Sequence, residues 1–186
     1  MASIFQQIGS IFGLTHNVPT VSAVSPSTSS ANTAFSLQSS NNAVTSGAET
    51  VYVAGPGNAT VDAHASSSPV VIVGNTGVDH LIGGSGPNLI IGGPGTNIMT
   101  GNAGTNDVFG HAAGATDYIT NFNPADGERI ALAQGLRYTA AHVATATPAT
   151  LGLGGAPMPS EAISFNDGST VTLLGVTESP NAHWFI

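Results

Sequence analysis

The chain has 186 residues, a formal net charge of −8 and charged side chains at only 6% of its positions, against about 25% in an ordinary soluble protein. It has no lysine, and its only bases are Arg129 and Arg137, so it cannot neutralise nucleic-acid phosphates or hold an anionic membrane surface. Cysteine is absent, which excludes disulfides, thiol catalysis and cysteine-based zinc sites. No apolar run is long enough to span a membrane, and the first residues lack the basic start of a Sec signal.

Residues 1–48 are predicted to form an N-terminal arm. Residues 15–48 are rich in Ser, Thr, Asn and Ala, and two alternatives stay open for them: disorder in the monomer, or extended strands that order on assembly. A short docking helix is predicted at the start of the arm, where apolar residues recur with the period of one helix face. These residues are Ile4, Phe5, Ile8, Ile11 and Phe12.

The pattern of the sequence changes to that of β-strands from Glu49 onward. The stretch AGPGNATVD is interpreted as a degenerate nine-residue repeat, with Ala59 in its sixth position and Val61 in its eighth. The run VVIVG that follows is typical of a buried strand. A solenoid is therefore predicted to start near residue 50 and to occupy residues 49–116.

Four nine-residue units follow one another from Gly74: GNTGVDHLI, GGSGPNLII, GGPGTNIMT and GNAGTNDVF. Their period matches the nonapeptide G-G-x-G-x-D-x-U-x, the calcium-binding repeat of RTX proteins, which forms a parallel β-roll. Two units make one coil of 18 residues, and coils stack about 4.8 Å apart. The eighth position is apolar in every unit and is predicted to point inward; it holds Leu81, Ile90, Met99 and Val108.

The sixth position, where the repeat has Asp, holds one carboxylate and three amides. The coil period predicts Asp79 stacked on Asn97, and Asn88 on Asn106. Calcium prefers six to eight oxygens and its affinity follows the ligand charge, whereas stacked Asn side chains can bond along the solenoid axis as an amide ladder. The sequence therefore favours a largely calcium-independent roll, with weak or partial calcium binding as the alternative. The calcium candidates are Asp79, Asn88, Asn97, Asn106 and Asp117.

The chain after the repeats resembles the C-terminal region of RTX proteins exported by type I secretion. The shared segments are Asp117–Phe122, Gly127–Leu132 and Asp167–Val176; Asn121 replaces an Asp of the family pattern. The resemblance covers residues 74–186 and implies that residues 117–186 cap the roll and are read by the export machinery. From the residues alone, Asp167-Gly168 is typical of a hairpin turn, and four apolar residues can close one end of the roll. These are Ile119, Phe122, Ile130 and Leu132.

Residues with the spacing of a catalytic or metal site are not apparent. The histidines at 16, 64, 80, 111, 142 and 183 have no metal-ligand spacing, and His80 is predicted to face solvent. The acids form no marked pair for acid–base chemistry. We therefore predict that the chain is not an enzyme.

The sequence predicts an all-β protein: a parallel β-roll with a C-terminal hairpin cap and a low-complexity N-terminal arm. The favoured function is an extracellular or cell-surface structural protein that self-assembles into filaments, a surface layer or matrix, because few charges keep copies apart. The alternative is a secreted module that folds on binding calcium. A third hypothesis is an adhesin, or an ice- or carbohydrate-binding surface, on rows of Thr96, Thr100 and Thr105.

Overall fold

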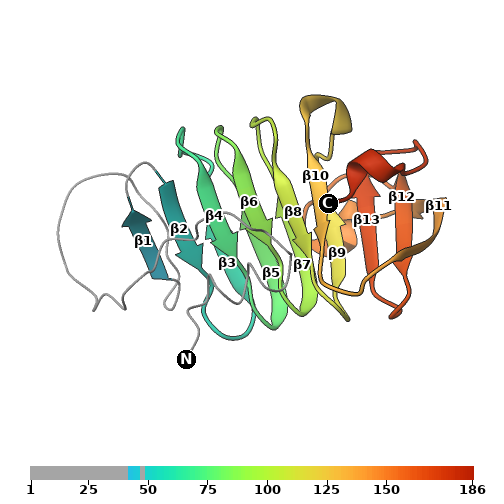
Figure 1. Ribbon diagram of the computed structural model, residues 1–186, viewed down its shortest axis with the longest axis horizontal. Helices are drawn as coiled ribbons and strands as arrows, with labels where there is room; N and C mark the ends of the chain where they lie inside the picture. The colour runs from blue at the N-terminus through green and yellow to red at the C-terminus, as the bar shows by residue number, and fades with distance from the viewer. Residues whose placement is uncertain (1–41, 47–48) are drawn as a thin grey trace.

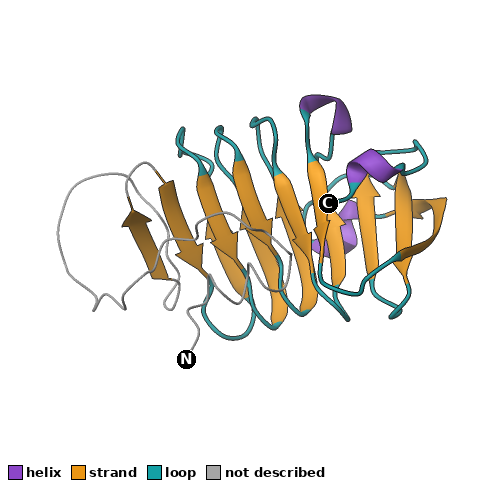
Figure 2. Ribbon diagram, viewed as in Figure 1, coloured by secondary structure: helices purple, strands orange, loops and turns teal. Residues whose placement is uncertain are grey.

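The computed structural model describes residues 42–46 and 49–186. The helix predicted at residues 4–12 and the strands considered for residues 15–41 lie outside these ranges. The strands form two sheets that face each other. Along the long axis of the molecule, the strands of each sheet follow one another without a break (Figure 1). Helical turns in the described part are short and lie toward the C-terminal end (Figure 2). None of them is long and apolar enough to cross a membrane.

The first sheet, sheet A, has the order β1-β2-β4-β6-β8-β10, in which all pairs after the antiparallel β1–β2 pair are parallel. Its strands are β1 (Asn42–Ser46), β2 (Glu49–Val53), β4 (Val70–Val73), β6 (Asn88–Ile91), β8 (Val108–His111) and β10 (Arg129–Leu132).

The second sheet, sheet B, has the order β11-β12-β13-β9-β7-β5-β3 and is parallel from β13 to β3. Its strands are β3 (Ala59–Asp62), β5 (Gly77–Ile82), β7 (Gly95–Thr100), β9 (Thr116–Ile119), β11 (Tyr138–Ala146), β12 (Met158–Phe165) and β13 (Thr170–Leu174). The chain alternates between the two sheets through the repeats, so each pair of short strands makes one coil of the predicted β-roll.

The degenerate repeat before Gly74 belongs to the roll. Ala59 pairs with Asp79 and Val61 with Leu81, as the sequence predicts. Asp79 in turn pairs with Asn97. Two turn glycines show why the repeat keeps glycine: Gly77 and Gly95 have φ angles of +134° and +126°, and a Cβ on Gly95 would lie 2.4 Å from the carbonyl oxygen of Gly77. Only glycine combines this backbone conformation with such close stacking of coils.

One residue is inserted in the fourth repeat, and the structure corrects the sequence register there. Leu89 pairs with Val108, an offset of 19 rather than 18 residues, and Asn106 takes up the extra residue with a φ angle of +61°. Phe109 therefore fills the inward position and is fully buried, whereas Val108 is half-buried. The predictions that Val108 points inward and that Asn106 stacks on Asn88 are wrong.

The core runs along the axis of the roll as two rows of buried apolar side chains, one from each sheet. Sheet B contributes Val61, Leu81, Met99, Ile119 and Leu173, and sheet A contributes Tyr52, Ile72, Ile90, Phe109 and Ile130.

The parallel ladders continue past residue 116, because β9 pairs with β7 and β10 with β8. The hairpin of β12 and β13 then extends sheet B, with Gly168 at a φ angle of +85° in its turn. The chain end packs down: Phe185 bridges to Ile130, and Trp184 is 2% exposed and lies edge-on to Phe122 at 5.3 Å. The predicted hairpin cap is confirmed.

Three 3-10 turns complete the described chain: η1 (Pro124–Asp126), η2 (Pro148–Leu151) and η3 (Ala182–Trp184). The Asn123 and Asn181 side chains cap η1 and η3 by accepting a backbone N–H bond.

Candidate metal centre

A column of buried polar side chains runs along the inner face of sheet B. Asp79, Asn97 and Asp117 occupy equivalent positions of β5, β7 and β9, and each is fully buried. Asp79 accepts backbone N–H bonds from Ala59 at 2.9 Å and Asn75 at 2.8 Å. Its two oxygens therefore tie one turn to the coil before it.

The next member of the column, Asn97, donates where Asp79 accepts. Its Nδ2 donates to the Gly93 carbonyl at 3.0 Å and to Asp117 Oδ1 at 2.7 Å. A carbonyl oxygen and a carboxylate oxygen thus converge on one amide nitrogen. The side chain links two successive coils by hydrogen bonds alone.

A second column lies where the sheet A strands β6, β8 and β10 begin, and we call it the sheet A column. It contains Asn88, Asp107 and Glu128, which are 3%, 0% and 2% exposed. Asn88 Nδ2 lies 3.1 Å from the Gly84 carbonyl, 2.9 Å from the Gly101 carbonyl and 2.8 Å from Asp107 Oδ1. Three oxygens surround a group that has two hydrogens to donate. Converging oxygens of this kind are the surroundings that a hard cation prefers.

The carboxylates of both columns are held in a low-dielectric interior. Burial raises the pKa of Asp107 and of Asp117. Burial, together with the nearby charges of Asp107 and Asp126, raises the pKa of Glu128 to about 7. The sheet A column therefore contains two acids whose ionised forms oppose each other.

Two oxygens of these columns lack a hydrogen-bond partner although they are buried: Asn97 Oδ1 and Asp107 Oδ2. An unpartnered buried acceptor is costly, and a cation would satisfy it. The unpartnered oxygen of the sheet A column belongs to a carboxylate, Asp107, whereas that of the sheet B column belongs to an amide, Asn97. Because calcium affinity follows ligand charge, Asp107, with the acid Glu128 near it, fits calcium better than Asn97 does. Within residues 42–46 and 49–186, no group of three or more His, Cys, Asp or Glu side chains is placed to hold a metal by itself.

The structure buries four of the five residues that the sequence singled out. Asp79, Asn97 and Asp117 share one column and Asn88 lies in the other, but Asn106 is exposed in a turn.

Sequence reasoning missed Asp107 and Glu128. The signal for Asp107 was present, since placing Phe109 rather than Val108 in the apolar column moves the polar column to Asp107. Nothing in the repeat pattern marks Glu128, because it lies beyond the last nine-residue unit.

Residues 73–108 match the model of the RTX calcium-binding nonapeptide repeat, which the description gives as four copies. The chain contains an RTX repeat segment. No curated protein is similar enough to match the chain. Among solved structures, it is similar to the AlgE6R3 subunit from the Azotobacter vinelandii mannuronan C5-epimerase, with 21% identity over 70% of this chain and 78% of that chain and a TM-score of 0.46.

The last coil of the roll is joined to the C-terminal hairpin by a relay of buried side chains. His111 is 1% exposed; its Nδ1 lies 2.6 Å from Asp117 Oδ2 and its Nε2 lies 2.9 Å from Ser169 Oγ. Ser169 Oγ in turn donates to Asp167 Oδ1 at 2.6 Å. The Ser169 bond lowers the pKa of Asp167 to about 2.

The order Ser–His–Asp is also that of an activated nucleophile, a base and an orienting acid. Two features favour a structural role for this relay. The Ser169 hydroxyl donates its hydrogen bond to Asp167 rather than to His111. Ser169 is also 3% exposed, so a substrate cannot reach it unless the hairpin opens. The relay connects β8, β9 and the β12–β13 turn, and it fixes the cap to the last coil.

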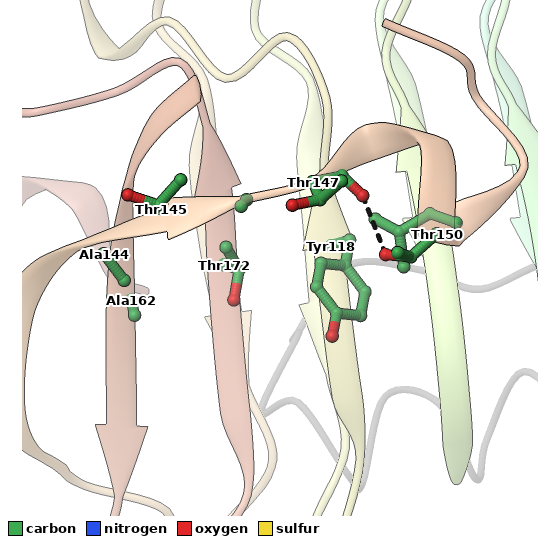
Figure 3. A pocket seen from close by; sticks show the side chains of 9 residues that line it. Tyr118, Ala144, Thr145, Thr147, Thr150, Ala162 and Thr172 are labelled. Carbon is green, nitrogen blue, oxygen red and sulfur yellow. Dashed lines mark hydrogen bonds between the residues drawn. The ribbon is translucent and has the colours of Figure 1, made fainter. Parts of the chain in front are cut away.

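A shallow groove lies on the outward face of sheet B beneath η2 (Figure 3). It has a volume of about 320 Å³ and is lined by uncharged side chains, among them Tyr118, Thr145 and Thr172. Thr150 Oγ1 donates to the Thr147 carbonyl at 2.7 Å and holds the η2 turn over the groove. The hydroxyl groups and the Tyr ring suit a small neutral ligand.

The threonines proposed as a binding row do not form one. Thr96 and Thr100 are half-buried on β7, and Thr100 Oγ1 lies 2.8 Å from Thr120 Oγ1. Thr105 is exposed in the turn that carries the inserted residue.

Proposed function

We propose that this chain is a secreted structural protein whose β-roll is held mainly by amide–carboxylate ladders, and whose copies associate into larger assemblies. The observation that carries the proposal is the position of the Asn88 and Asn97 amide nitrogens. Each lies at a point where oxygens from two successive coils converge. In an RTX repeat with Asp in that column, the same point would need a cation.

An amide satisfies this point differently from calcium. It supplies two directed N–H bonds and no charge, so the coils are joined without an external ion. The remaining carboxylates keep their charge or take up a proton, which agrees with the raised pKa values of Asp107 and Asp117. A roll of this type is expected to fold before it meets calcium.

Export and an extracellular location are supported by the RTX segment, since such repeats are typical of secreted proteins. The resemblance of residues 117–186 to the C-terminal region of type I substrates supports that pathway. Self-association is supported by the low content of charged residues.

A calcium-responsive module is the second candidate, and the sheet A column favours it. Asp107 Oδ2 is unpartnered, and burial, with a further contribution from the charge of Asp107, raises the pKa of Glu128. Asp107 and Glu128 would hold the ion, which would supply charge neutralisation between coils. Neutralisation would let both side chains ionise and would tighten the C-terminal end of the roll.

Circular dichroism during a calcium titration of the purified chain, started in chelator, separates the two candidates. The structural proposal predicts β-rich spectra in chelator and a modest rise in melting temperature with calcium. A coil spectrum in chelator that becomes β-rich at millimolar calcium would instead establish the calcium-responsive module. Electron microscopy of the same samples tests assembly, and monodisperse monomers at high concentration under all conditions would refute it.

A further inference from the structure

The strand β11 ends sheet B with an edge that carries few of the usual protections. It has nine residues, is the longest strand of the described chain, and has one ladder partner there, β12. Val143 is 54% exposed and Tyr138 is 45% exposed. Natural edge strands are usually short or carry Lys, Pro or inward charges that prevent pairing with another chain. This strand has none of these, although it begins with a register shift between Tyr138 and Ala140.

The edge strand also belongs to an uncharged stretch of a strongly acidic chain, and the acid opposite Val143 on β12, Glu161, is 1% exposed. From Tyr138 to Ser160 the sequence contains no Asp, Glu, Lys or Arg, whereas the chain as a whole has a net charge of −8. Two copies repel each other over most of their surfaces, and this repulsion is weakest where they meet through this region. The charge distribution therefore favours a second copy of this chain as the occupant of the edge.

The sequence of the strand is close to a palindrome, which decides the geometry. Residues 139–145 read TAAHVAT. If two strands run antiparallel about a two-fold axis at His142, then His142 meets His142 of the other copy, and Ala140 meets Ala144. Ala141 meets Val143, and threonine meets threonine at the ends. Isologous pairing requires a self-complementary surface of this kind, and small or β-branched cross-strand pairs fit closely.

We propose that β11 pairs with β11 of a second copy, antiparallel and centred on His142, so that sheet B continues through a dimer. This inference rests on the proposed self-assembly and names its first contact. The edge lies at the far end of the row from β1 (Figure 1). Because a two-fold contact closes on itself, a filament would need a further contact elsewhere on the molecule. A strand-sized interface is small, so we expect a weak dimer that depends on concentration.

Disulfide trapping tests the register directly, because the chain has no cysteine of its own. In the full-length chain, the variant His142→Cys should form a covalent dimer under mild oxidation, since position 142 faces itself. Ala140→Cys is the matched control on the same side of the strand. Its copies lie four residues apart along the ladder, about 13 Å, which is beyond disulfide reach. An equimolar mixture of Ala140→Cys and Ala144→Cys should crosslink again.

Equal crosslinking of His142→Cys and Ala140→Cys alone would overturn the register, and absence of crosslinking in all samples would overturn the contact. The latter is also the outcome expected if β11 pairs with residues of its own chain outside the described ranges.

A second measurement uses Val143→Lys in sedimentation velocity, with circular dichroism as a check on folding. This variant should shift the chain to monomer at concentrations where the wild type dimerises. Larger assemblies that persist in Val143→Lys would refute this interface and leave the structural function standing. Trapped dimers without any larger assembly would support the β11 interface and contradict the proposal that copies associate into larger assemblies.

Discussion

The substitution Asn97→Asp tests whether amide groups replace calcium in the roll. In the column of sheet B it removes the donor that lies 2.7 Å from Asp117 Oδ1 and 3.0 Å from the Gly93 carbonyl. It leaves a third carboxylate between Asp79 and Asp117, which are both fully buried. The variant thus exchanges an attraction between coils for a repulsion.

The expected size of the effect follows from these contacts. A hydrogen bond to a charged group contributes about 1.5–3 kcal/mol, and two charges about 4 Å apart at an effective dielectric constant of 20 repel by about 4 kcal/mol. Proton uptake by one carboxyl relieves part of the repulsion, so we expect a loss of about 3–5 kcal/mol in chelator. For a chain of this size, a loss in that range lowers the melting temperature by roughly 6–20 °C.

Thermal unfolding followed by far-ultraviolet circular dichroism, in chelator and in excess calcium, measures this effect. Calcium should restore most of the loss in Asn97→Asp, because the ion binds the folded state and gives about 2.7 kcal/mol at a hundred times its dissociation constant. The matched control is Asn58→Asp, an exposed side chain that uses only its Oδ1, as an acceptor for the Val78 N–H. If, in chelator, Asn97→Asp has the same melting temperature as Asn58→Asp and the wild type, the amide bridge does not hold the coils together.

Three further variants test other parts of the structure. Burial raises the pKa of Glu128 from its ordinary value of 4.5 to about 7, so its contribution to the free energy of unfolding is fully present below about pH 4.5 and is lost as pH rises through about 7. In chelator, melting temperature should therefore fall less from pH 4.5 to 8 in Glu128→Gln than in the wild type, and parallel curves would contradict the assignment. His111→Ala removes the buried hydrogen-bond partner that Asp117 Oδ2 and Ser169 Oγ share and should cost about 1–3 kcal/mol in urea unfolding, while the exposed His183→Ala should change little. Equal effects of the two variants would show that the His111 contacts do not stabilise the fold. Phe109→Ala should lower the free energy of unfolding by about 3–5 kcal/mol, and Val108→Ala, at a half-buried position, by much less. A larger loss for Val108→Ala would indicate that Val108, and not Phe109, fills the inward position.

The comparison of sequence and structure is most informative at the fourth repeat. Glycine and the inward apolar residue recur with a fixed period because each coil repeats the same backbone conformation, so the roll, the stacking of Asp79 on Asn97 and the degenerate repeat at Ala59 follow from the sequence. The extra residue at Asn106 breaks the period without changing the composition of the unit, and the pattern alone continues in the wrong register. Burial of the large Phe109 ring in the core decides between the two registers, since it removes the most apolar surface from water.

The all-β roll, the hairpin turn at Gly168 and the low charge can be predicted from the sequence, because they depend on local conformation and on composition. Which polar atoms face one another depends on the folded chain. Asn88 meets Asp107, Asp107 opposes Glu128, and His111 reaches Ser169 across 58 positions of the chain. These contacts depend on how coils stack and on how the cap closes, and no nine-residue pattern contains them.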